Sequence, residues 1–188
     1  MGDRTGQTEQ RYLLIDTPIG ACGMAWSDMG IARFQLPHAS RELTEARLAR
    51  RGRIPAVTPL PPAIEDAVAA VQEYMGGRTI DFSSIEVDLT GVPEFHREVY
   101  AALRRIPWGG ATTYGELAST LGVPGAARAI GQAMGRNPVP VIIPCHRVLA
   151  SGGLLGGFSA PGGRTTKHRL LALERVGAVE TLPLFAAR

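Results

Sequence analysis

The chain has 188 residues, of which 45% are hydrophobic, so it can form one large domain or two small ones with a substantial core. It contains no run of about 18 consecutive apolar residues, which a membrane span requires, and its first seven residues lack the apolar segment of a secretory signal. Two cysteines, Cys22 and Cys145, exclude a disulfide framework and favour a reducing, cytoplasmic location.

The formal net charge is +3, but the charge is unevenly distributed. Residues 1–90 contain 9 arginines against 12 acidic residues, whereas residues 91–188 contain 10 arginines and 1 lysine against 5 acidic residues. The basic second half favours a polyanionic partner such as nucleic acid, and a solvated basic surface is the alternative.

Three strands and two helices are predicted in the first half. Strands separated by short turns are predicted at residues 12–16, 21–26 and 31–36, as a small antiparallel meander. Ser40 is expected to cap a helix that ends near residue 51. A second helix, ended by Gly76 and Gly77, is predicted from the spacing of Ile64, Val68, Val71 and Met75. Residues 79–89 return to a strand pattern.

Residues 90–93, Thr-Gly-Val-Pro, are predicted to link a mixed domain of residues 1–90 to a mostly helical domain of residues 91–188. A helix is expected after Pro93, with one apolar face formed by Phe95, Val99, Leu103 and Ile106.

Two further helices surround a glycine-containing turn at residues 122–125. Thr113 and Glu116 fit a capping box that starts the first of them, and the second is predicted over residues 126–136. This arrangement favours a helix-turn-helix that binds nucleic acid, and a helical hairpin inside a bundle is the alternative. The small residues of the second helix would let its backbone approach a phosphate chain closely.

The residues around Cys145 are the candidates for a catalytic site. The apolar run 139–143 predicts a short buried strand that ends at Pro144, because proline cannot donate to a sheet. A thiol followed by His146 and Arg147 is a favourable setting for a reactive cysteine, since the thiolate is the nucleophile. In an extended chain the thiol and the imidazole point apart, which favours proton transfer through a water unless the backbone turns. A buried structural cysteine beside a surface histidine is the alternative.

The segments Asn137-Pro138-Val139-Pro140 and Pro144-Cys145-His146-Arg147-Val148 resemble the active-site signature of the O6-alkylguanine-DNA alkyltransferases, the methylated-DNA–protein-cysteine methyltransferases. The resemblance covers residues 80–177 well and the N-terminal third loosely. It implies a two-domain α/β fold, with a ribonuclease-H-like first domain carrying an antiparallel sheet and a winged-helix-like second domain. It also implies DNA repair by stoichiometric, single-turnover transfer of the alkyl group of O6-alkylguanine in double-stranded DNA to Cys145. O4-alkylthymine is a second candidate substrate.

The resemblance implies roles for four further residues. His146 would take the thiol proton and Glu174 would orient its imidazole, although a solvated helix glutamate is the simpler alternative. Tyr114 would donate to the flipped guanine, and its alternative is a core aromatic. Asn137 would act as a hinge that ties the recognition helix to the active-site turn, where an ordinary Asn-Pro turn is the alternative.

In the family the second helix of the helix-turn-helix enters the minor groove and flips the damaged base. Arg128 matches the arginine that fills the gap in the base stack, and a simple phosphate contact is the alternative. The other residues expected to contact DNA are Tyr114, Ala127, Gly131 and Gln132. The residues expected to line the substrate pocket are Pro140, Val148, Phe158 and Ser159.

Two departures from the family pattern lie in the glycine-rich segment 150–164. Phe158 stands where many members have tyrosine, which removes one hydroxyl, and the loop is about two residues longer at 160–161. No metal or cofactor is expected, because Cys22 has no nearby ligand partners and is expected to be a core residue. A monomer is expected. The rival functions are a lesion-binding protein without transfer, a Cys-His hydrolase, and a helix-turn-helix regulator with an incidental thiol.

Overall fold

The computed structural model describes residues 9–50 and 52–177, and the expectation for the first seven residues lies outside that range. The chain divides into two compact units. The first runs to Pro93 and also includes Pro138–Ile143, while the second comprises Glu94–Asn137 and the chain from Pro144 onward. The predicted division at residue 90 did not include this return of the chain to the first unit.

The first unit is built on a four-stranded sheet with the order β3-β2-β1-β4. The predicted meander is confirmed, because its three strands pair antiparallel: β1 (Arg11–Thr17), β2 (Gly20–Ser27) and β3 (Gly30–Gln35). The sheet is nevertheless mixed, since β4 (Ile54–Pro55) pairs parallel with β1. A two-residue strand is too short to show a period in the sequence, which is why it was missed.

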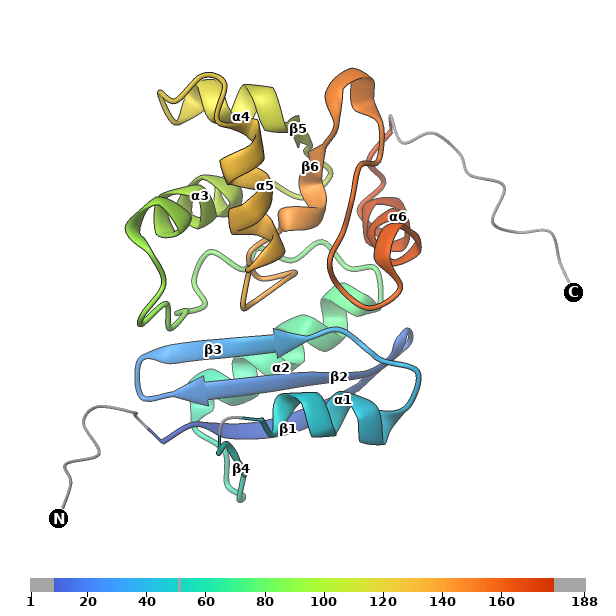
Figure 1. Ribbon diagram of the computed structural model, residues 1–188. Helices are drawn as coiled ribbons and strands as arrows, with labels where there is room; N and C mark the ends of the chain where they lie inside the picture. The colour runs from blue at the N-terminus through green and yellow to red at the C-terminus, as the bar shows by residue number, and fades with distance from the viewer. Residues whose placement is uncertain (1–8, 51, 178–188) are drawn as a thin grey trace, which may run out of the picture. The chain divides into compact units, whose positions relative to one another are not determined.

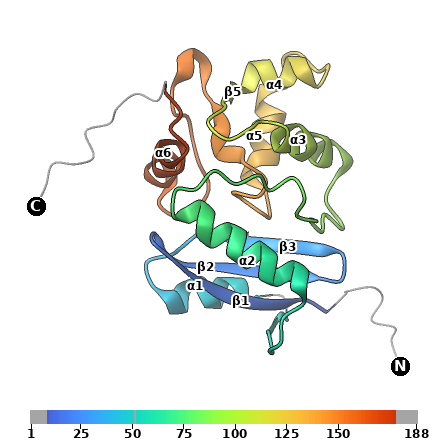
Figure 2. The ribbon, with the colours of Figure 1, turned by 180° about the vertical axis from the view of Figure 1, so that it is seen from behind.

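Two helices cover opposite faces of this sheet, α1 (Arg41–Leu48) and α2 (Pro62–Met75) (Figure 1, Figure 2). The Ser40 side chain accepts a hydrogen bond from the Leu43 amide at 3.2 Å, which confirms the predicted cap. The apolar face of α2 is buried and the helix ends at Gly76. The core of the unit therefore lies between the sheet and its two helices.

Two predicted strands are wrong. Residues 79–89 form only an isolated bridge between Val87 and Ile31, because the polar side chains in this segment bond locally, as in the 2.8 Å bond from the Ser83 amide to Asp81. In the segment 139–143 all residues except the half-buried Pro140 are buried as expected, but the segment curls into a turn in which Ile143 N donates to Val139 O at 2.9 Å. The prolines within and beside it cannot supply a ladder of donors.

In its described residues, the second unit contains four α-helices, two short 3₁₀ helices and a two-stranded parallel sheet, so the described chain has a mixed α/β fold. Its elements are α3 (Glu94–Arg104), β5 (Thr112–Thr113), α4 (Tyr114–Thr120), α5 (Ala127–Gly135), η1 (Cys145–Arg147), β6 (Val148–Leu149), η2 (Ser151–Gly153) and α6 (Gly163–Leu173). The capping box of Thr113 and Glu116 is present at the start of α4, as predicted. Helices α4 and α5 pack on each other, and the Tyr100 hydroxyl of α3 donates to Ala133 O of α5 at 2.7 Å.

In the part of the chain that the structure describes, no helix has the length and apolar character needed to cross a bilayer.

Candidate active site

Cys145 lies in a single turn of 3₁₀ helix, η1, that starts after Pro144. The backbone therefore turns at this proline. In such a turn the side chains of Cys145 and His146 need not point to opposite sides, as they would in a strand. The turn is closed by the hydrogen bond from Arg147 N to Pro144 O at 3.0 Å. Cys145, His146 and Arg147 are all buried, so the histidine is not the surface residue of the simpler alternative.

The strand that follows this turn fixes the position of Tyr114. Strand β6 pairs parallel with β5, with Val148 opposite Thr112 and Leu149 opposite Thr113. Tyr114 is the next residue after β5 and the first of α4, while the cysteine lies three residues before β6. The two-stranded sheet thus holds the tyrosine and the thiol at a fixed separation.

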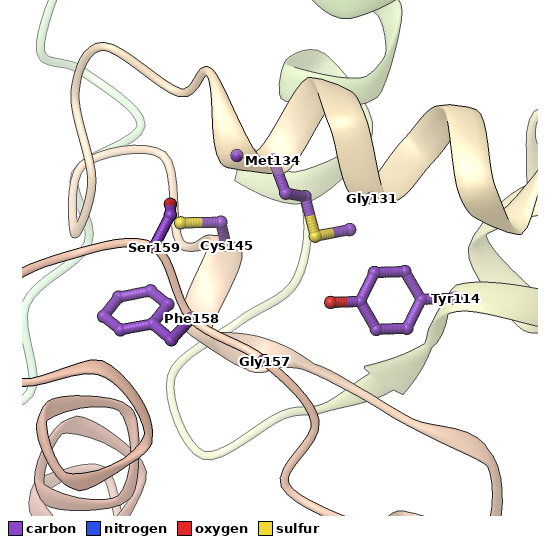
Figure 3. A pocket seen from close by; sticks show the side chains of 8 residues that line it. Tyr114, Gly131, Met134, Cys145, Gly157, Phe158 and Ser159 are labelled. Atoms are coloured by element: carbon purple, nitrogen blue, oxygen red, sulfur yellow. The ribbon is translucent and has the colours of Figure 1, made fainter.

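A cavity of about 340 Å³ opens between these residues. It is lined by Tyr114, Gly131, Met134, Gly135, Cys145, Gly157, Phe158 and Ser159. Figure 3 shows the Tyr114 hydroxyl directed toward the cavity from one side, the Met134 side chain entering from α5, and Cys145, Phe158 and Ser159 on the opposite side. The volume and the mixture of apolar walls with a few polar groups are those of a small-molecule pocket.

The thiol of Cys145 receives a hydrogen bond from the Asn137 side-chain amide, with 3.2 Å between Nδ2 and Sγ. Burial raises the pKa of this thiol, and the Asn137 bond, the charge of Lys167 and local backbone amides oppose that rise. Cys22 gives the contrast, because burial raises its pKa to about 12. It is a core residue, as predicted.

His146, Arg147 and Glu174 form one buried cluster. Glu174 Oε1 lies 2.8 Å from His146 Nε2, and the carboxylate also accepts two 2.8 Å hydrogen bonds from Arg147 Nε and Nη2. Arg147 Nη1 donates to the Ile106 carbonyl. The guanidinium that the sequence places beside the thiol is therefore matched by a carboxylate, and it is not a cation held for the sulfur.

Two opposing effects act on the pKa of the His146 imidazole. Burial lowers its pKa, and the neighbouring Glu174 carboxylate opposes this effect. Because a carboxylate only accepts hydrogen bonds, the histidine carries its proton on Nε2. A proton taken from elsewhere must then arrive at Nδ1.

The residues expected to contact DNA lie on α4 and α5. Arg128 and Gln132 are exposed, whereas Ala127 and Gly131 are half-buried. A Cβ built on Gly131 would lie 3.7 Å from Cε1 of Tyr114, so the helix and the tyrosine ring are in close contact here.

Two of the four expected pocket residues, Phe158 and Ser159, line the cavity. Val148 is fully buried in β6, and the cavity lining does not include it. Pro140 belongs to the first unit, and its part in the pocket stays a prediction.

Four residues of the site were not among those predicted from the sequence: Met134, Gly135 and Gly157, which line the cavity, and Lys167, which bonds to the Gly157 carbonyl. Met134 lines the cavity one helical turn after Gly131, and it carries no chemical signal of its own. Lys167 has a fully buried side chain whose Nζ donates to Val148 O at 2.6 Å. The signal for it was available, since the chain's 20 basic residues include a single lysine.

The chain is similar to several known proteins. Residues 94–176 match the model of the 6-O-methylguanine DNA methyltransferase DNA binding domain. A methylated-DNA–protein-cysteine methyltransferase of Mycolicibacterium paratuberculosis is 39% identical over 174 residues, which span 93% of this chain and 98% of the relative. The crystal structure of Mycobacterium tuberculosis OGT in complex with DNA matches with a TM-score of 0.71 and 36% identity, over 88% of this chain and 92% of that one. The O6-methylguanine-DNA methyltransferase of the archaeon Pyrococcus kodakaraensis matches with a TM-score of 0.65 and 26% identity, over 89% and 99%.

Proposed function

The chain belongs to the family of methylated-DNA–protein-cysteine methyltransferases, and we propose that it repairs DNA by moving the alkyl group of O6-alkylguanine directly onto Cys145. The observation that carries this proposal is a cysteine whose sulfur lines a cavity and accepts a hydrogen bond from Asn137, beside a buried histidine–carboxylate pair. The match to a DNA-binding domain over residues 94–176 supports duplex DNA as the partner.

The chemistry begins with the thiol proton of Cys145, which passes to Nδ1 of His146. Glu174, on the far side of the imidazole, stabilises the imidazolium that results. The thiolate then attacks the alkyl carbon, the carbon–sulfur bond forms, and the bond from that carbon to O6 breaks. The electron pair of the broken bond leaves with the guanine.

Tyr114 assists the departure of guanine, which is a poor leaving group unless donors meet its developing negative charge. Burial and then the charge of Cys145 raise the pKa of this tyrosine, so its hydroxyl keeps a proton to donate. The product on Cys145 is a thioether, and nothing in the reaction regenerates the thiol. Each protein molecule therefore acts once.

The alkylated base reaches the cavity by leaving the DNA double helix. In an intact duplex the O6 edge of guanine is held in the base pair and faces the major groove, so a protein bound in the minor groove can bring it to the sulfur only by flipping the nucleotide out. We place α5 in the minor groove and assign Arg128, an exposed planar cation, to the gap that the base leaves. Ala127 and Gly131 on the same helix are half-buried and small, so they allow α5 to approach the sugar-phosphate backbone of the DNA closely.

The direct test is to incubate the protein with duplex DNA that carries one O6-methylguanine and to measure protein mass. We expect one added methyl group, on the peptide that contains Cys145, and repair that stops at one event per molecule. Cys22→Ser is the matched control and should still be methylated. Turnover of many substrates would point to a hydrolase, and binding without a mass change would point to a lesion-binding protein.

A second experiment tests the DNA-binding assignment. Arg128→Ala should slow repair of duplex DNA at least ten-fold more than it slows reaction with free O6-methylguanine base, because only the duplex leaves a gap to fill. Equal losses on both substrates would refute the stacking role.

A further inference from the structure

Tyr100, on α3, carries a buried phenol that the reaction described above does not use. The residue is 1% exposed, and a tyrosine buried to this extent needs a partner for its hydroxyl. That partner is Ala133 O of α5, which accepts a hydrogen bond from the Tyr100 hydroxyl at 2.7 Å. The His96 ring, one helical turn earlier on α3, lies 6.2 Å from the Tyr100 ring, centroid to centroid. The phenol is therefore fixed between its own helix and α5, which lie side by side (Figure 1).

The acceptor of this bond belongs to the last turn of α5, where backbone carbonyls lose their regular helical partners. Here the helix tightens, because Arg136 N donates to Ala133 O at 3.1 Å. Asn137 N donates to Met134 O at the same distance, and both bonds span three residues. Bonds of this 3₁₀ type have poorer geometry than those of an α-helix. The shorter bond from Tyr100 therefore reinforces an end of α5 that its own backbone holds weakly.

Two groups of the active site are attached to this turn. Met134, the residue after Ala133, lines the cavity. Asn137, four residues after Ala133, donates from Nδ2 to the Cys145 sulfur at 3.2 Å. A hydrogen bond weakens steeply as its angle closes, so a small shift at the end of α5 weakens the bond from the amide to the sulfur. Two hydrogen bonds and one helical turn thus join the Tyr100 hydroxyl to the thiol.

We propose that Tyr100 is a positioning residue for the nucleophile, and that its hydroxyl holds the end of α5 where the Asn137 amide meets the Cys145 sulfur. The inference rests on the proposed function, in which that sulfur attacks the alkyl carbon. Tyr100 is not among the described residues that line the cavity, so it acts through α5 and Asn137 and not on the substrate. Without its hydroxyl the amide is less well aimed at the sulfur, and it favours the thiolate less.

The Tyr100 hydroxyl stays a donor at neutral pH. Burial above all raises the pKa of this tyrosine to about 12, and Arg136, on α5, opposes the rise. The other titratable groups near the thiol are Tyr114 on α4, His146 in η1 and Lys167 on α6. A substitution that removes only the Tyr100 hydroxyl leaves all of these in place. A change in the titration of the thiol then reports on the hydrogen bond that the sulfur receives.

The first experiment measures how labelling of Cys145 by iodoacetamide depends on pH, with mass spectrometry to locate the label. Tyr100→Phe removes one oxygen and keeps the ring, so the core stays filled while the bond to Ala133 is lost. We expect the profile to move up by about half a pH unit, a roughly three-fold loss of labelling at neutral pH. Tyr12→Phe is the matched control, because it removes a hydroxyl that donates to Glu45 at 3.2 Å in the first unit, and its profile should match the wild type. A Tyr100→Phe profile equal to that of the wild type would overturn the proposal.

The second experiment compares Asn137→Ala with the double variant that also carries Tyr100→Phe. Because the tyrosine acts through the Asn137 amide, Tyr100→Phe should no longer move the labelling profile once this amide is gone. A shift as large as in the wild-type background would refute the route through Asn137.

A third measurement observes the amide itself. The chain contains one asparagine, so protein grown with asparagine that carries 15N in its side chain gives one NH₂ signal. In Cys145→Ala this amide has no sulfur to bond, and in Tyr100→Phe its signal should move part of the way toward the position seen in Cys145→Ala. A signal that stays at the wild-type position would contradict the positioning role. None of these measurements involves DNA, so absence of methyl transfer by wild-type protein would instead refute the proposed function, which separates the two failures.

Discussion

Glu174→Gln is the perturbation whose consequences the structure specifies most fully. The carboxylate is 1% exposed and accepts from His146 Nε2 and from two nitrogens of Arg147, all at 2.8 Å. A glutamine amide has one acceptor oxygen and one donor nitrogen. Whichever way it is turned, its NH₂ group faces at least one of these three donors, and the buried guanidinium loses its countercharge.

Removal of one partner from a buried ion pair costs about 3–5 kcal/mol, because the other charge stays buried without compensation. That is a large part of a net stability of about 5–15 kcal/mol. For a chain of this length it corresponds to a fall in Tm of roughly 6–20 °C. Methyl transfer should also slow, on the order of 100-fold, since His146 loses the carboxylate that stabilises its imidazolium.

The assay is urea denaturation of the wild type, Glu174→Gln, Arg147→Met and the double variant. Removal of both charges leaves neither unpaired, so the double variant should be less destabilised than the sum of the single variants by about 2 kcal/mol. Single-turnover methyl transfer on the same four proteins completes the measurement. A cost for Glu174→Gln below about 1 kcal/mol, together with additive behaviour in the cycle, would refute the reasoning.

Three further predictions concern local features. Asn137→Ala removes the amide that lowers the pKa of the active-site thiol, so that pKa rises and iodoacetamide labelling moves to higher pH; an unmoved profile would contradict this. Gly162→Ala places a side chain at φ 77° with its Cβ 2.3 Å from Thr166 Oγ1, so the free energy of unfolding should fall by about 1–3 kcal/mol in urea denaturation. Gly125→Ala is the control and should cost less, because Gly125 has φ 88° but nothing lies within 4 Å of the added Cβ. Thr113→Ala removes the helix cap and should cost about 1 kcal/mol in the same assay, whereas Thr113→Ser should restore most of it.

Features of the sequence whose causes lie within a few residues were predicted from it. The Ser40 cap bonds three residues along the chain, and the capping box of Thr113 and Glu116 does the same. The turn signals at residues 17–20 and 27–30 predicted the meander, because each turn joins two strands that are neighbours along the chain. The residue types around Cys145 left a buried structural cysteine open as an alternative, and the resemblance of the flanking segments to the alkyltransferase signature favoured a reactive one.

The partners of the buried charges were decided only by the tertiary structure. Glu174 meets Arg147 across 27 positions, and Lys167 meets Val148 across 19 positions. The turn at Pro138–Ile143 likewise depends on a distant contact, since Phe34 N donates to Pro138 O at 3.0 Å. Neither the spacing of apolar residues nor the secondary-structure propensity of a segment predicts contacts between residues so far apart in the chain.

The sequence by itself therefore singled out Cys145 as the candidate nucleophile, through its residue types and the family resemblance of the segments around it. Only the tertiary structure decided how the buried charges near that thiol are paired. Arg147 is its neighbour along the chain but is bound by Glu174, while Lys167 comes from a helix about twenty residues away. The physical reason is that a buried charge is governed by what surrounds it in space, and proximity along the backbone does not set those surroundings.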